Sequence, residues 1–350
     1  MSLLDFPYRL LAKMVTSDPE AFIALGNAET RLLKKRLPVV TSPVYICGLA
    51  RAGTTILTKA IATHPDVATH TYRDFPCLFT PYYWNKMLSA FDWVPFRAKP
   101  HERAHKDGMM VTPKSPEAME EMLWMAFFKQ LHDETRSAIL DAKTSNEAFA
   151  AFYREHIQKL LLAHNKTRYA SKANYNLTRI PYILSLFPDA RFVIAVRQPL
   201  PHVWSLYQKD KLFRAEQEKT PASLTHMQQA GHFEFGKGRT LIHTGDDAAM
   251  ASVRACFANG EDLRGWARYW AMLQRFIAQE CTPRPEVLIV RHEDICAHKE
   301  TMAQIADHCR LKYSDTKLAA AAGIFRETTP PAIPKDMEVI IREETEGVSA

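Results

Sequence analysis

The feature that most constrains the fold is a strand, a glycine-bounded loop and a helix in direct succession. Val44 to Cys47 are apolar or aromatic and indicate a short buried strand. The helix that follows begins at Thr54 and ends at Pro65, and its apolar residues share one face: Ile56, Leu57, Ala60 and Ile61. Backbone N–H groups converge in such a loop, and the helix dipole favours negative charge there. The unit therefore predicts an anion-binding site.

The loop has the spacing of a phosphate loop, with Gly48, four residues and then Gly53. A nucleoside-triphosphate loop continues with lysine and then serine or threonine, whereas here Thr54 occupies the lysine position. The only cation of the loop is Arg51. A loop without that lysine is a poor site for a nucleoside triphosphate. A strand–turn–helix corner without any ligand is the alternative that this segment alone leaves open.

A second patterned unit lies downstream. Residues 168–172 indicate a strand, residues 177–187 a helix, and residues 191–197 an almost wholly apolar strand, which together form a βαβ unit in a parallel sheet. Arg197 ends the last strand, and Ser205 lies eight residues later in the first turns of the next helix. Taken alone, the pair could be a surface cation and an ordinary helix residue. An arginine at this position suits phosphate because its planar donors meet two oxygens at once.

With both motifs in this order, the chain resembles the sulfotransferase family, in its bacterial-type branch, over about residues 40–310. In that family, a basic residue two places before Gly-Thr-Thr belongs to the loop for the 5′-phosphosulfate of 3′-phosphoadenosine 5′-phosphosulfate. An arginine at a strand end and a serine eight residues later grip the 3′-phosphate. The resemblance implies these donor-binding residues: Gly48, Arg51, Ala52, Gly53, Thr54, Thr55, Arg197 and Ser205. Ala52 stands where the family commonly has serine, which removes one hydroxyl and leaves the backbone cradle.

The resemblance also implies a fold and a reaction. We expect one α/β domain over residues 1–350, with a parallel sheet flanked by helices in the P-loop nucleotide-kinase-like sulfotransferase fold with helical insertions. Residues 1–37 form an N-terminal helical extension, and residues 328–350 a flexible tail rich in proline and acid. The sulfonyl group passes in line from the donor, without a metal, to a hydroxyl or amine of an unidentified glycan, lipid or small metabolite.

The catalytic residues follow from what the transfer requires. Arg51 and the loop amides are placed to stabilise charge on the leaving phosphate and sulfonyl oxygens. Lys172 falls where the family often has a lysine or histidine, beside the sulfonyl group. A base must take the acceptor proton. We expect Asp74, just past a second strand over residues 66–72, or else His70; an ion pair between Asp74 and Arg73 is the alternative.

The other segments carry weaker signals. Residues 76–115 predict an irregular insertion near the acceptor, and Ser115-Pro116 predicts the start of a helix that runs to about residue 131. Residues 220–260 are expected to be loose, as a lid or a surface excursion. The run from Arg291 to Ile295 is similar to a late Tyr-Glu-Asp-Leu motif of the family, with His292 in place of the tyrosine.

Composition limits the partners and the compartment. The net charge of +6 suits an anionic substrate, and we expect no nucleic-acid partner. Six scattered cysteines, no apolar run of membrane-spanning length and no secretory signal predict a cytoplasmic protein. The basic N-terminal segment could contact anionic lipid, although a helix packed on the domain is the preferred interpretation. The rival functions are a P-loop kinase and a non-catalytic nucleotide-binding protein.

Overall fold

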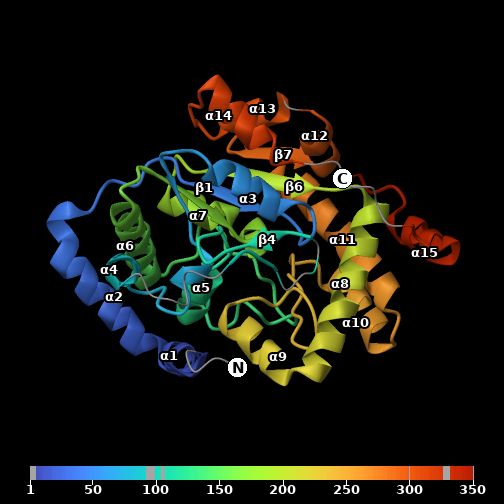
Figure 1. Ribbon diagram of the computed structural model, residues 1–350. Helices are drawn as coiled ribbons and strands as arrows, with labels where there is room; N and C mark the ends of the chain where they lie inside the picture. The colour runs from blue at the N-terminus through green and yellow to red at the C-terminus, as the bar shows by residue number, and fades with distance from the viewer. Residues whose placement is uncertain are drawn as a thin grey trace.

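A five-stranded parallel sheet forms the centre of the protein (Figure 1). The computed structural model describes residues 5–91, 99–103, 106, 108–298, 300–325 and 332–349. The strands of the sheet are β1 (Val44–Cys47), β2 (Val67–Ala68), β5 (Arg168–Lys172), β6 (Arg191–Val196) and β7 (Val287–Arg291), and their order is β2-β5-β1-β6-β7. Each pair of neighbours is parallel. The predicted parallel α/β sheet is confirmed.

Both faces of the sheet are apolar, because successive side chains of a strand point to opposite sides. In β1, Val44 and Ile46 face one core cluster, whereas Tyr45 and Cys47 face the other. The first cluster is covered by α3 (Thr54–Ala62), α13 (Glu300–His308) and α14 (Asp315–Ala322). The second is covered by α6 (Glu147–His164), α7 (Ile180–Leu186), α8 (Pro199–Lys219) and α11 (Asp262–Phe276). The sheet is thus the middle of three layers.

The remaining elements surround these layers. They are α1 (Asp5–Ser17), α2 (Pro19–Leu33), η1 (Lys34–Arg36), η2 (Tyr72–Asp74), α4 (Pro81–Phe91), β3 (His101–Glu102), β4 (Met110–Val111), α5 (Glu121–Phe127), η4 (Asn174–Thr178), α9 (Pro221–Gln229), α10 (Asp247–Ala258), the π-helical turn η5 (Ile277–Cys281), α12 (His292–Ala297) and α15 (Lys335–Thr345). The N-terminal helices follow their sequence signals: Asp18 caps α2 by accepting from the N–H of Ala21 at 3.0 Å.

The helix expected from Ser115 begins only at Glu121. Residues 113–117 instead run beside residues 70–73: the N–H of Tyr72 donates to the Ser115 carbonyl at 3.2 Å, and the N–H of Glu117 donates to the His70 carbonyl at 3.0 Å. These pairings supply the backbone hydrogen bonds that a first helical turn leaves unmade, so tertiary contacts override the N-terminal helix signal. Glu117 consequently lies beside the residues that follow β2.

Three further expectations need correction. The strand expected to end near Tyr72 pairs only over Val67–Ala68. The insertion contains α4 and the hairpin of β3 and β4, and its residues 92–98, 104, 105 and 107 lie outside the described part. The expected flexible tail contains α15, whose Ile341 is fully buried and whose Glu344 pairs with Arg268 of α11 at 2.7 Å. Burial of that apolar side chain fixes the helix despite the acidic composition.

Residues 230–244, between α9 and α10, are packed rather than loose. Phe235, Leu241 and Ile242 are buried in the core. The N–H of Gly236 donates to Asp210 of α8 at 2.8 Å, and the N–H of Ile242 donates to the Tyr269 hydroxyl at 2.9 Å. This segment therefore forms a fixed wall beside α8 and α11.

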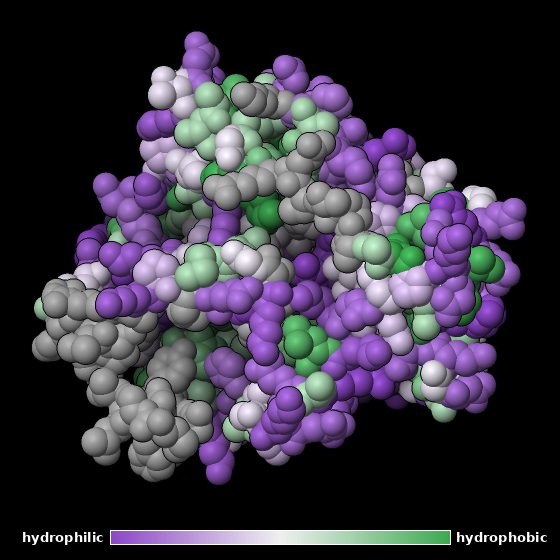
Figure 2. Space-filling view, turned by 45° about the vertical axis from the view of Figure 1, so that its right-hand side comes forward, coloured by the Kyte–Doolittle hydropathy of each residue, from purple (hydrophilic) through white to green (hydrophobic). Residues whose placement is uncertain are grey.

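The surface and the cysteines complete the description. Hydrophilic side chains cover most of the face shown in Figure 2, and apolar patches are small and scattered between them. Within the described residues, no helix has both the length and the apolar content that crossing a membrane requires. All six cysteines are free thiols.

Candidate active site

The glycine-bounded loop joins the end of β1 to the start of α3 at the centre of the sheet. Gly48 has φ +139°, and a Cβ there would lie 2.4 Å from the Ala195 carbonyl oxygen of β6. Gly53 has φ +98°, and its Cβ would lie 2.6 Å from Nδ1 of His292. Both positions therefore require glycine, for conformation and for space. Gly53 has no side chain to cap α3, so the first N–H groups of that helix can serve an anion.

Three residues predicted for donor binding meet at this loop. Nε of Arg51 donates to Oγ of Ser205 at 3.1 Å, and Nη1 of Arg197 donates to the Arg51 carbonyl at 3.3 Å. Nε of Arg197 is buried and makes no hydrogen bond. Burial lowers the pKa of Arg197, and the neighbouring Arg51 guanidinium lowers it further. Two guanidinium groups held together, one with a buried Nε that makes no hydrogen bond, form a site that fits an anion.

The buried side chain of His202, which was not among the predicted site residues, contacts the backbone of the loop from the core side. Nε2 of His202 lies 2.8 Å from the Ala50 carbonyl oxygen, and Nε1 of Trp270 donates to Nδ1 of His202 at 3.1 Å. Because Nδ1 accepts a hydrogen bond, Nε2 must carry the proton. Burial lowers the pKa of His202 to about 3. His202 lies three residues before Ser205, so one face of α8 supports the loop twice.

His202 predicts a pH-dependent stability. Its pKa is lowered from 6.5 to about 3 on folding, so between those values the unfolded chain binds a proton that the native protein does not. The free energy of unfolding should fall as pH decreases through this range, at up to about 1.4 kcal/mol per pH unit from this residue. Urea unfolding from pH 7 to pH 4 should show a shallower slope for His202→Gln than for the wild type. If the free energy of unfolding has the same slope against pH in both proteins, His202 does not contribute to the pH dependence of stability.

Lys172 lies at the end of β5, next to the loop. The N–H of Ala173 donates to the Ile46 carbonyl at 3.1 Å, so Lys172 is held beside the strand position two residues before Gly48. Its Nζ lies 3.9 Å from Oε1 of Glu117. Burial alone would raise the pKa of Glu117, but Lys172, His232 and the Tyr72 hydroxyl outweigh it and bring that pKa to about 2. Glu117 was missed because its sequence indicates a helix start.

Asp74 and His70 lie in a different environment. Oδ2 of Asp74 accepts from the N–H of Thr71 at 2.7 Å and lies 3.5 Å from Nδ1 of His70, whereas Oδ1 accepts from Asn85 at 3.2 Å. Nε2 of His70 lies 3.1 Å from Nε2 of His156. Both Asp74 and His70 are 2% exposed. These contacts indicate a structural role for Asp74 and argue against its use as the base.

The alternative expectation for Asp74 also needs revision. Arg73 donates to the side-chain oxygen of Asn85 at 3.0 Å, so Asn85 lies between the two residues as a shared partner. Burial raises the pKa of Asp74, but hydrogen bonding and charge from His70 outweigh burial and lower it. His70, with smaller contributions from the Thr71 N–H and His164, therefore favours the ionised form of this carboxyl.

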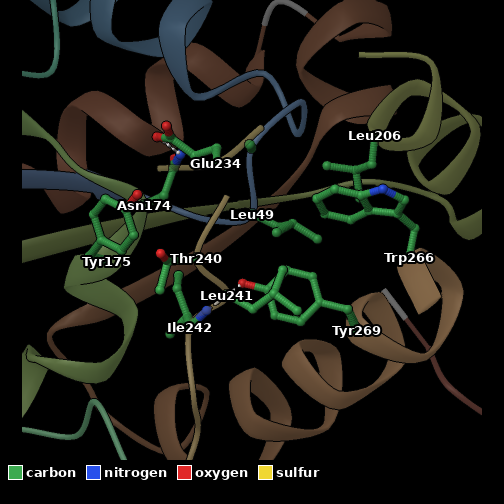
Figure 3. Close-up of a pocket in the computed structure, with 11 residues that line it drawn as sticks. Leu49, Asn174, Tyr175, Leu206, Glu234, Thr240, Leu241, Ile242, Trp266 and Tyr269 are labelled. Atoms are coloured by element: carbon green, nitrogen blue, oxygen red, sulfur yellow. Dashed lines mark hydrogen bonds between the residues drawn. The ribbon is translucent and has the colours of Figure 1, made fainter. Parts of the chain in front are cut away.

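A small cavity lies behind the loop, between Leu49 and the wall of residues 230–244 (Figure 3). Its volume of about 20 Å³ has room for roughly one water molecule. Nδ2 of Asn174 donates to Oε1 of Glu234 at 3.0 Å at its edge. Trp266, Tyr269 and Leu206 close the opposite side. The cavity is thus a small gap in the packing behind the loop, and it is too small to hold a nucleotide.

Comparisons with known proteins give one family and several structures. A family model described as the sulfotransferase family matches residues 43–235, more than half of the chain. The sulfotransferase STF1 from Mycobacterium tuberculosis H37Rv is similar over 97% of this chain and 82% of its own, with 16% identity and a TM-score of 0.49. The sulfotransferase STF9 from Mycobacterium avium is similar over 92% and 82%, with 14% identity and a TM-score of 0.44. No curated protein matches the chain.

The matched range includes both groups of residues described above. It begins one residue before β1 and ends within the wall of residues 230–244. The glycine-bounded loop, Lys172, Arg197 and Ser205 all lie inside it. Among the described residues, no group of three or more His, Cys, Asp or Glu side chains could hold a metal ion.

Proposed function

This chain belongs to the sulfotransferase family, and from that premise we propose that it transfers a sulfonyl group from 3′-phosphoadenosine 5′-phosphosulfate to an acceptor. The observation that carries the proposal is the meeting of Arg51, Arg197 and Ser205 at the glycine-bounded loop. The buried, unsatisfied Nε of Arg197 fits a phosphate oxygen there. The acceptor group is a hydroxyl or amine of a glycan, lipid or small metabolite.

The donor is proposed to bind at two places. Arg197 and Ser205 hold the 3′-phosphate, and the amides of residues 53–55 with the hydroxyls of Thr54 and Thr55 hold the phosphosulfate. Nη1 of Arg103 donates to Oγ1 of Thr55 at 3.2 Å and adds a cation at the start of α3. Arg103 belongs to the insertion of residues 76–115, in which no specific motif is recognisable. The donor supplies an activated sulfonyl group, and the protein supplies alignment and charge.

We assign the base to Glu117 in place of Asp74. Glu117 is 8% exposed and lies 3.9 Å from Lys172, which is paired with Ile46 of β1, two residues before Gly48. Its low pKa of about 2 makes it a weak base while Lys172 pairs with it. An anion bound at the loop competes for the Lys172 ammonium, and loss of that partner raises the pKa of Glu117. Glu117 then accepts the acceptor proton while Lys172 stabilises sulfonyl oxygens.

The 3′-phosphate assignment predicts a selective loss of binding. Arg197→Ala should weaken adenosine 3′,5′-bisphosphate by about 2–3 kcal/mol, or roughly 30- to 150-fold, the scale of charged hydrogen bonds. Adenosine 5′-phosphosulfate, which lacks the 3′-phosphate, should bind almost unchanged. Calorimetry with both ligands measures the difference, and Arg191→Ala, at the opposite end of β6, is the control. Equal losses for both ligands would contradict the assignment.

Two other functions remain to be separated by experiment. Calorimetry with ATP and magnesium tests the P-loop kinase, which the threonine at position 54 disfavours. A screen of acceptors with isotopically labelled donor, read by mass spectrometry, tests for transfer itself. A non-catalytic nucleotide-binding protein would bind adenosine 3′,5′-bisphosphate and transfer nothing in that screen.

A further inference from the structure

The N-terminal helices α1 and α2 follow one another along one edge of the molecule (Figure 1). One side of each is buried on the body through Ala12 and Val15 of α1 and Gly26 and Leu33 of α2. The other side carries large apolar side chains in water: Leu10 is 49% exposed, Met14 53%, Leu25 53% and Leu32 72%. We call these four residues the N-terminal apolar face.

The spacing shows that the exposed residues are organised. Leu10 and Met14 lie four residues apart in α1, and Leu25 and Leu32 lie seven apart in α2, so each pair shares one side of its helix. Single exposed leucines are ordinary, whereas aligned ones on consecutive helices mark an interaction surface.

The exposed charge near the C-terminal end of this face is basic, whereas Asp18 and Glu20 at the start of α2 are exposed and acidic. From position 21 to position 40 the exposed charged residues are all basic: Arg31, Lys34, Lys35 and Arg36. The one acidic residue of that range, Glu29, is 2% exposed and pairs with Lys159 at 3.2 Å. Nη2 of Arg36 donates to the Tyr82 hydroxyl at 3.0 Å, which fixes η1, the basic turn that follows α2, on α4.

We propose that the N-terminal apolar face, with its basic end, binds the surface of an anionic lipid membrane. Aligned apolar side chains next to a basic cluster are the composition of helices that lie in the membrane interface. An anionic membrane supplies the opposite charge for the basic residues as well as an apolar phase for the leucines, and a dimer through the same face is the competing outcome of the test. The proposal does not depend on the proposed function, because it uses none of the residues at the glycine-bounded loop.

The test is flotation of the full chain with vesicles of two compositions. Phosphatidylcholine vesicles with one part in three phosphatidylglycerol should bind the protein, and pure phosphatidylcholine vesicles should bind it far less. Added salt should weaken the binding because it screens the basic cluster. Lys34→Ala with Lys35→Ala should reduce partition by about 25-fold, roughly fivefold for each charge. Lys143→Ala, at an exposed position elsewhere, should leave it unchanged.

The apolar contribution is tested separately. Leu25→Asp with Leu32→Asp should abolish flotation, whereas Val339→Asp, at a 52% exposed position of α15, should not. Equal thermal unfolding of the variants and the wild type shows that the fold is kept, and the lysine variants serve if the leucine variants unfold. Absent binding, equal binding to both vesicle types, or a dimer that only the leucine substitutions dissociate would each overturn the proposal.

Discussion

Arg51→Ala should lower turnover by a factor of about 10²–10³, the usual cost of removing one preorganised donor from a site of developing charge. Arg51 is the cation of the loop and is held there with φ +74°, while its Nε contacts Ser205. Product binding should fall less than tenfold, because Arg197 and the loop amides still hold the two phosphates. Turnover is measured with an acceptor from the labelled-donor screen, and product binding by calorimetry with adenosine 3′,5′-bisphosphate.

Arg51→Lys is the matched variant for this experiment. It keeps a positive charge and loses the planar donor group, so its turnover should lie between those of Arg51→Ala and the wild type. Because Nε of Arg51 donates to Ser205, a proposed ligand of the 3′-phosphate, Arg51 could instead act by holding that phosphate in the ground state. If product affinity falls by as much as turnover, Arg51 is a ground-state clamp for the 3′-phosphate and does not act on the transition state.

The sequence predicted the elements whose signals are local. The glycine-bounded loop required glycine at two positions, and the structure gives both a positive φ and no room for a Cβ. Arg197 and Ser205 could be placed because a strand end and a helix start fix where side chains lie relative to the sheet. The meeting of Arg51, Arg197 and Ser205 follows from β1 pairing with β6.

The rest depended on long-range pairing. Glu117 has the local pattern of a helix start, and only its N–H bond to the His70 carbonyl places it near Lys172. His202 lies between Arg197 and Ser205, the two residues that drew attention to this segment. Its own role depends on Trp270, 68 residues away, whose N–H donates to Nδ1 and so fixes the tautomer of His202. Asp74 has the right distance from a strand end, but its contacts with Thr71 and Asn85 turn it into the core. Contacts of this kind have no signal within a short window.

Glu117→Gln should lower turnover by a factor of about 10²–10⁴ with little change in affinity for adenosine 3′,5′-bisphosphate, because glutamine keeps the shape and cannot take a proton. The wild-type rate should rise with pH through one acidic ionisation, and that rise should vanish in the variant. The apparent pKa of the rise should lie above the value of about 2 set by Lys172, since the donor competes for that lysine. Turnover is followed from pH 4 to pH 8 with labelled donor.

Asp74→Asn is the matched control, because it makes the same chemical change in the neighbouring carboxylate. Asparagine keeps only one of the two oxygens that accept from the N–H of Thr71 and from Nδ2 of Asn85, and it removes the charge beside His70, so the variant should have a lower unfolding temperature and near-normal turnover. The opposite pattern, an active Glu117→Gln and an inactive Asp74→Asn, would show that Asp74 is the base and Glu117 is not. If both variants stay active, His70→Ala is the remaining substitution to examine. His70 is the other predicted base, and its carbonyl accepts a hydrogen bond from the N–H of Glu117, which places the two residues side by side.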